Sequence, residues 1–225
     1  MLLLQWLIHP SIPAVIAFAL QTLLLLTLVV LFIDRKPRRP IYTVDTFDHG
    51  LVSWTAEDLG RATVNEGVGV PLPCLDLFPL HDVPSLKYVL AFRDIPEFRG
   101  GTIECDVRLT ANSLLNILFM ADIRGRQFYM ARLDSRPQCW DSFLEMERHY
   151  EWWEYRVRSQ TVTPTEQWVH IRLEIGSTSA VLYRDNDEVL RIALTDFHHK
   201  PERYQIGLFS EVGAVFVDNF AVTIA

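Results

Sequence analysis

The distribution of apolar residues divides the chain into two unlike parts. Residues 14–33 read AVIAFALQTLLLLTLVVLFI, a run without a single charged side chain. At a rise of about 1.5 Å per residue, a helix of this length spans the roughly 30 Å hydrocarbon core of a bilayer. Ser11 suits the N-cap of such a helix, and Pro13 suits its first turn. The pattern therefore predicts one transmembrane helix over about residues 12–33, within an N-terminal membrane segment of residues 1–34.

Residues that flank the apolar run indicate how it would lie in a membrane. Aromatic and polar groups precede it, and a basic linker over residues 35–40 follows it. The residues predicted at the membrane interface are Trp6, His9, Arg35, Lys36, Arg38 and Arg39. Because no Lys or Arg precedes the run, the sequence favours a retained anchor over a cleaved signal peptide. The positive-inside rule then places the N-terminus outside and the rest of the chain in the cytoplasm, at a bacterial-type inner membrane.

Beyond residue 40 the pattern changes to a period of two. Short runs rich in Val, Ile, Phe and Tyr alternate with turn residues such as Gly100-Gly101 and Asp185-Asn186-Asp187. The predicted strands cover residues 86–93, 102–110, 116–123, 127–134, 168–176, 180–185, 188–194, 204–211 and 214–224. Only PSLKYVL and residues 141–150 are compatible with a turn or two of helix. We therefore predict an all-β domain over residues 41–225, with two antiparallel sheets packed face to face.

Four segments of this domain resemble, in order, the concanavalin A-like jelly-roll sandwiches. They are FDHGLVSWTAEDLG (47–60), FRGGTIECDVRL (98–109), WVHIRLEIGSTSAVLYRDNDEVLRI (168–192) and GLFSEVGAVFVDNFAVT (207–223). The likeness is greatest to the laminin-G type and to the bacterial keto-disaccharide hydrolase-like domains. It implies that Asp218-Asn219-Phe220 lies in the closing strand of the sandwich. Since these motifs are structural, the resemblance implies a fold, and the function it encourages most is a glycan-binding or glycan-cleaving module.

Composition and charge narrow the classes of partner. The chain has 225 residues, of which 49% are hydrophobic and 22% charged, as expected for one folded domain with an attachment. Its formal net charge is -7, and four of its basic residues lie in the linker that follows the apolar run. So acidic a domain repels phosphate backbones, which excludes nucleic acid as a partner. Cys74, Cys105 and Cys139 are widely spaced and odd in number, a pattern typical of reduced core thiols.

Patterns that would indicate catalysis or metal binding are weak. The pairs Glu145/Glu147 and Glu104/Asp106 alternate as the two carboxylates of a retaining glycosidase would, but a solvated strand face also alternates. Asp185-Asn186-Asp187 offers oxygen ligands of the kind that bind calcium in laminin-G relatives, and is equally typical of a hairpin turn. The hairpin interpretation is favoured. We predict no cofactor, no metal site and no enzymatic activity.

The segment CWDSFLEMERHYEWWEYRVRSQ, residues 139–160, is unusually rich in Trp, Tyr and Arg. These residue types dominate binding hot spots because they bury large areas and retain a polar group. The candidate partner-binding residues are Trp140, Tyr150, Trp152, Trp153, Tyr155, Arg156 and Arg158. Contact with a partner and core filling are equally favoured, and a platform for sugar rings is the third alternative.

Together these features predict a non-catalytic, membrane-anchored accessory subunit that stabilises a larger inner-membrane complex. Its partners would be the lipid bilayer and other membrane-protein subunits, which it would contact through the helix and the sandwich. By analogy of architecture alone, the host would be a photosynthetic or respiratory complex. The alternative is a membrane-tethered glycan-binding or glycoside-hydrolase-like module. A sensor or adaptor ranks last, because no output segment follows the predicted sandwich.

Overall fold

A computed structural model places two units along the chain, Met1–Arg39 and Pro40–Ala225. The residues that the structure describes are 20–25, 27, 41–52, 54–56, 61–70, 72–78, 90–95, 100–122, 127–146, 154–194 and 204–224. Residues 20–25 and 27 are helical. Within the described residues, no helix is both long enough and apolar enough to cross a membrane. Most of the predicted span over residues 12–33, and every residue predicted at the membrane interface, lies outside the described residues.

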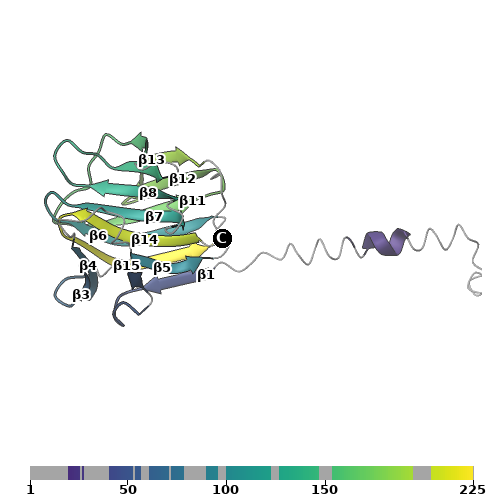
Figure 1. Ribbon diagram of the computed structural model, residues 1–225, viewed down its shortest axis with the longest axis horizontal. Helices are drawn as coiled ribbons and strands as arrows, with labels where there is room; N and C mark the ends of the chain where they lie inside the picture. Colours follow the sequence, from purple (N-terminus) through teal and green to yellow (C-terminus); the bar gives the residue numbers. More distant parts are fainter. Residues whose placement is uncertain are drawn as a thin grey trace, which may run out of the picture. The chain divides into compact units, whose positions relative to one another are not determined.

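The second unit is an all-β sandwich, as predicted. The strands of its described part are β1 (Ile41–Asp45), β2 (Thr55–Ala56), β3 (Arg61–Asn65), β4 (Cys74–Phe78), β5 (Leu90–Ile95), β6 (Gly101–Leu109), β7 (Leu114–Asp122), β8 (Gln127–Asp134), β9 (Ser142–Met146), β10 (Glu154–Arg158), β11 (Trp168–Ile175), β12 (Ser179–Arg184), β13 (Asp187–Ala193), β14 (Tyr204–Val212) and β15 (Val215–Ile224). Figure 1 shows how these strands run across the sandwich.

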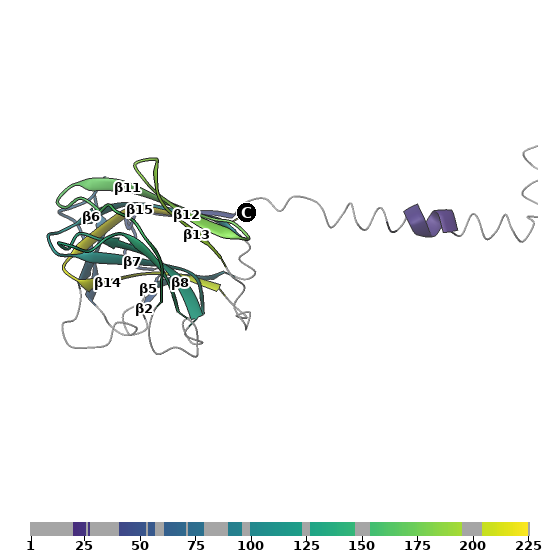
Figure 2. The same ribbon diagram turned by 90° about the horizontal axis from the view of Figure 1, so that it is seen from above.

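The strands form two antiparallel sheets that lie in separate layers (Figure 2). The eight-stranded sheet has the order β13-β12-β11-β6-β15-β4-β3, with β1 paired to β15. The seven-stranded sheet has the order β10-β9-β8-β7-β14-β5-β2. Strands that are neighbours in space are often distant in sequence, since β6 lies between β11 and β15. This topology brings residues from β7, β8, β9 and β14 onto one face.

The sequence pattern predicts strands best where one face is open to solvent. In β6 every second residue from Ile103 to Leu109 is buried, and β11 alternates in the same way. The expectation of a helical turn within residues 141–150 is wrong for β9, because its backbone pairs with β8, with Phe143 opposite Ala131. Tertiary pairing here overrides a weak local preference. The short strands β1 to β4 and β10 were not predicted, although β3 (RATVN) and β10 (EYRVR) alternate between polar and apolar residues.

The core lies between the two sheets. In β7 and β8 the inward residues are Leu115, Ile117 and Phe119 and, opposite them, Tyr129, Ala131 and Leu133. Phe119 and Tyr129 stack with their ring centroids 5.7 Å apart. Since successive residues of a strand point to opposite faces, the residues between these lie on the outer face of the seven-stranded sheet.

Two of the three cysteines are buried in the sandwich. Cys105 belongs to the core cluster, and Cys74 has no exposed surface. Burial is the main cause that raises the pKa of the Cys74 thiol to about 12, and it raises the pKa of Cys105 as well. Both groups are therefore neutral thiols at physiological pH. Cys139 is partly exposed, and all three are free cysteines.

Candidate functional site

The outer face of the seven-stranded sheet carries two kinds of side chain. One part of it is an apolar cluster whose members are all buried, namely Leu118, Ala121, Phe128, Met130, Leu144 and Phe209. Two residues away along β7 and β8 the same face becomes polar, with Asn116 directly opposite Arg132. Asn116 and Arg132 are buried as well, so the polar end reaches solvent mainly through Glu211, whose side chain is 20% exposed.

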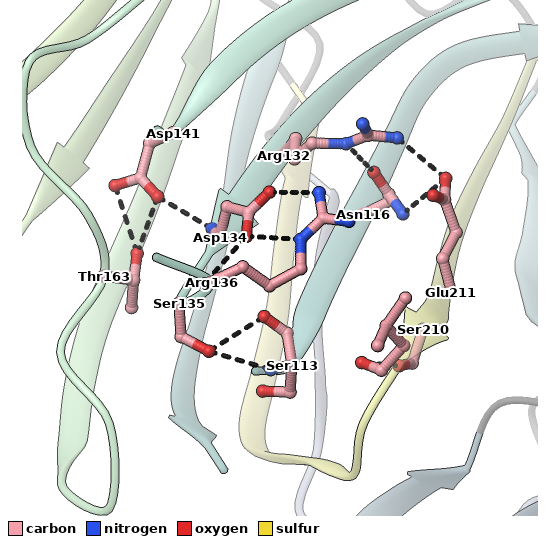
Figure 3. A network of polar contacts seen from close by, with 11 residues as sticks. Ser113, Asn116, Arg132, Asp134, Ser135, Arg136, Asp141, Thr163, Ser210 and Glu211 are labelled. Carbon is pink, nitrogen blue, oxygen red and sulfur yellow. Dashed lines mark hydrogen bonds and ion pairs between the residues drawn. The ribbon is translucent and has the colours of Figure 1, made fainter. Parts of the chain in front are cut away.

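A hydrogen-bonded triad occupies that end, as Figure 3 shows. Arg132 donates from Nε to Asn116 Oδ1 at 3.0 Å and from Nη2 to Glu211 Oε1 at 2.7 Å. Asn116 Nδ2 donates to the same Glu211 oxygen at 3.3 Å. The Arg132 side chain is 6% exposed and that of Glu211 is 20% exposed, so the glutamate forms the solvent side of the triad. The three residues come from the adjacent strands β8, β7 and β14.

A second ion pair lies next to the triad at the end of β8. Arg136 donates from Nε and Nη2 to the two oxygens of Asp134, at 2.9 and 2.6 Å. This bidentate pairing raises the pKa of the Arg136 guanidinium, and Asp134 is almost completely buried. Ser135 fixes the same turn, because its Oγ accepts a hydrogen bond from Ser113 N at 2.9 Å. The turn that follows β8 is thereby held against the start of β7.

Asp141 joins the two sheets beside this turn. Its carboxylate accepts hydrogen bonds from Asp134 N at 2.9 Å, Thr163 Oγ1 at 3.0 Å and Arg184 Nη1 at 2.9 Å. Arg184 ends β12, which belongs to the eight-stranded sheet. The Asp141 side chain is 1% exposed, and burial raises the pKa of its carboxyl to about 6. The opposing contributions of Arg184, Thr163 and the backbone amide are smaller than this desolvation.

Ser142 of β9 adjoins the polar end. Ser142 lies opposite Arg132 on one side and Arg158 on the other. Its Oγ is buried and has no hydrogen-bond partner in the described part of the chain. Trp140, two residues earlier, is 43% exposed. The polar end thus continues into β9 through Ser142, and the exposed Trp140 precedes that strand in the chain.

The structure describes only the ends of the predicted aromatic binding segment. Trp140 is exposed. Arg156 and Arg158 are exposed on β10, and each has an interaction partner. Tyr155 also belongs to β10, where it lies opposite Leu144. Tyr150, Trp152 and Trp153 lie outside the described residues.

Of the acidic pairs singled out in the sequence, Glu104 and Asp106 lie on the same partly exposed face of β6. Asp106 is held by two neighbours, since its oxygens lie 2.9 Å from His170 Nδ1 and 2.7 Å from Asn219 Nδ2. Glu145 is in β9, and Glu147 lies outside the described residues.

The hairpin between β12 and β13 uses the predicted polar turn. Asp185 and Asn186 have positive φ angles of 50° and 73°, and Asp185 Oδ1 accepts a hydrogen bond from His170 N at 2.9 Å. Among the described residues, no group of three or more His, Cys, Asp or Glu side chains could hold a metal ion.

Sequence reasoning missed the triad and its neighbours, although a signal was present. All eight residues of β8 are buried, yet the strand contains Arg132 and Asp134. A buried charge in an apolar strand is an informative departure from the usual pattern. Asn116 in the middle of β7 is the same kind of signal, because it is fully buried between apolar neighbours.

No protein-family model matches the chain, and no curated protein matches it by sequence. Solved structures do match it. Carbohydrate-binding module CBM66 from Bacillus subtilis is 16% identical, with a TM-score of 0.52 over 78% of this chain and 94% of that one. Endo-β-1,4-glucuronan lyase from Trichoderma reesei is 12% identical, with a TM-score of 0.55 over 84% and 96%. A galectin-like protein of unknown function from Bacillus subtilis is 11% identical, with a TM-score of 0.56 over 82% and 99%.

The chain has a jelly-roll sandwich fold. At these identities the likeness establishes the fold alone, and it agrees with the resemblance to concanavalin A-like sandwiches. The comparisons contradict the prediction of an accessory subunit of a membrane complex, because two of the three similar proteins are named for carbohydrate binding and carbohydrate cleavage. The prediction that the chain is not an enzyme is contradicted too, since a lyase is among them. The prediction of no enzymatic activity rested on weak short motifs, whereas this fold assembles its polar site from separate strands.

Proposed function

We propose that the sandwich recognises carbohydrate at the polar end of the outer face of its seven-stranded sheet. The observation that carries the proposal is the triad of Arg132, Asn116 and Glu211, in which the glutamate side chain is 20% exposed. Guanidinium and amide groups donate hydrogen bonds and carboxylates accept them, so such a network meets both needs of a sugar hydroxyl. Its members already hold one another in place, which lowers the entropy lost when a ligand binds.

The exposed ring of Trp140 supports the same assignment. A sugar has apolar faces as well as hydroxyl groups, and aromatic rings offer large, rigid apolar surfaces with little conformational entropy to lose. The similar structures support it as well, because CBM66 is named as a carbohydrate-binding module and the Trichoderma protein as a glucuronan lyase. The chain spans 94% and 96% of those two structures.

Replacing Arg132 by Lys is expected to weaken oligosaccharide binding at least tenfold. Lysine keeps the charge but lacks the planar fork that contacts Asn116 and Glu211 together. The purified full-length chain in mild detergent would be screened against labelled oligosaccharides, and the best ligand measured by calorimetry. New reducing ends or unsaturated products would be sought in the same mixtures, because the fold is shared with a lyase.

Arg191→Lys is the matched control. Arg191 pairs with Glu188 at 2.7 Å, exposed on β13 of the other sheet, so this variant should bind as the wild type does. Trp140→Ala should also weaken binding about tenfold while leaving the unfolding temperature unchanged, because its ring is exposed. Failure of the wild type to bind any oligosaccharide, or equal binding by the Arg132 and Arg191 variants, would contradict the proposal.

We also propose that residues 12–33 anchor the sandwich in a membrane, with the N-terminus outside. The uncharged run and the basic residues after it support this orientation. Cys139 allows a test, because it is partly exposed while Cys74 and Cys105 are buried. A membrane-impermeant maleimide should label the protein only after the cells are permeabilised, and Cys139→Ser should abolish the signal. Labelling of intact cells would overturn the orientation, and release of the protein by alkaline carbonate would overturn the anchor.

A further inference from the structure

We infer that the ligand of this site is a neutral glycan rather than an acidic one, an inference that rests on the proposed function. Within the described residues, the cations of the site are matched by carboxylates. The pairs are Arg132 with Glu211 at 2.7 Å, Arg136 with Asp134 at 2.6 Å, and Arg184 with Asp141 at 2.9 Å. Three positive and three negative groups leave the cluster without a net charge.

An acidic sugar would have to break one of these pairs. Arg132 is the cation of the triad, and its side chain is 6% exposed. A uronate that reached it would displace Glu211 from a guanidinium to which Asn116 is also bonded. Breaking a buried ion pair in this way is strongly unfavourable, because one charge loses its partner in a desolvated place. A sugar hydroxyl can bind without displacing Glu211 from Arg132.

The group that the triad presents to solvent is an acceptor. Glu211 uses Oε1 for both Arg132 and Asn116, and within the described residues its Oε2 makes no hydrogen bond. A neutral sugar can donate a hydroxyl proton to this oxygen, whereas a carboxylate or sulfate would meet it as a like charge. Arg156 and Arg158 at the edge of the sheet each have an interaction partner as well.

The backbone places Glu211 in this position. The register of β14 against β7 shifts between Ser210 and Val212, so that these two pair with Leu115 and Leu114 and Glu211 is the extra residue. Such a bulge changes the direction of a side chain relative to the regular alternation, and bulges are frequent next to functional sites.

At longer range the net charge of -7 repels polyanionic chains and leaves neutral ones unaffected.

The test compares matched neutral and acidic ligands on the full-length chain in mild detergent. The neutral probes are tetrasaccharides of glucan, xylan, mannan and galactan, and the acidic probes are tetrasaccharides of glucuronan, galacturonan and alginate. We expect the best neutral ligand to bind at least tenfold more tightly than any acidic one. Raising the salt from 50 to 500 mM should change its affinity less than twofold, because no net charge is neutralised on binding.

Glu211→Gln gives the sharper result. The amide still accepts a hydrogen bond, but Arg132 then keeps an uncompensated charge, so binding of the acidic probes should rise at least tenfold. Glu188→Gln releases Arg191 on β13 in the same way and serves as the control, with no expected change.

The outcomes separate the inference from the proposed function. Tighter binding of an acidic probe by the wild type, or equal gains in acidic binding by Glu211→Gln and Glu188→Gln, would overturn the inference while carbohydrate recognition stands. A steep loss of the best neutral ligand's affinity at high salt would overturn it as well, even if the Glu211 variant failed to fold. The absence of any glycan binding by the wild type would overturn both.

Discussion

Gly101→Ala is expected to destabilise the sandwich by roughly 3 kcal/mol or more, enough to unfold a domain of ordinary stability at moderate denaturant concentrations. A Cβ atom on Gly101 would lie 2.1 Å from the carbonyl oxygen of Thr223. Gly101 begins β6 and pairs with Ile224 of β15 on one side and with Ile175 of β11 on the other. Because the obstacle is backbone in the middle of a sheet, no side-chain rotation relieves the clash. Equilibrium unfolding in urea measures the effect.

Gly67→Ala is the control for this substitution. Gly67 lies in the turn after β3, where an added Cβ would meet only Asn65 Oδ1, at an ordinary 3.5 Å. Its unfolding free energy should stay within about 0.5 kcal/mol of the wild type. If Gly101→Ala were as stable as this control, β6 could not lie between β11 and β15 as the structure has it.

The agreement between sequence and structure depends on which faces of a strand are buried. β6 and β11 each bury one face, so their alternating residues reveal both the strand and its orientation. In β8 all eight residues are buried, and the period of two disappears although the element itself was predicted. β9 was not predicted, because Phe143 and Leu144 belong to separate apolar clusters on opposite faces of the sheet. When both faces of a strand are buried, both carry apolar residues, and the alternation of polar and apolar positions that identifies a strand is lost.

The site could not have been predicted from spacing. Asn116 and Arg132 are 16 residues apart, and Glu211 is 79 residues from Arg132. They meet because β14, β7 and β8 are neighbours in the sheet order, which only the complete fold determines. The sequence contains polar and charged residues within apolar strands. This pattern marks individual positions as unusual, but it does not indicate which of these residues contact one another in the fold. Of the aromatic segment that the sequence singled out, Trp140 is exposed and precedes Ser142 of β9 by two residues.

Stability is expected to increase as the pH falls from about 7 to about 4. Burial raises the pKa of Asp141 from 3.8 to about 6, so between these values the folded state binds a proton that the unfolded state releases. The free energy of unfolding therefore decreases as the pH rises from about 4 to about 6. Above this range, with the Asp141 carboxyl ionised, it is lower by about 3 kcal/mol than in acid. Burial also raises the pKa values of Asp76 and Asp218, which act in the same direction. Urea unfolding at a series of pH values measures the slope.

Asp141→Asn should remove most of that slope. The amide oxygen can still accept hydrogen bonds from Asp134 N and Thr163, but the side chain no longer ionises. Asp187→Asn, at an exposed position of the β12–β13 hairpin, should retain the slope of the wild type. If the unfolding free energy of Asp141→Asn depended on pH as steeply as that of the wild type, buried Asp141 would not be the group that causes this dependence. Because Asp141 ties β8 to Arg184 of the other sheet, and lies between Trp140 and Ser142, its ionisation links the stability of the sandwich to the edge of the proposed glycan site.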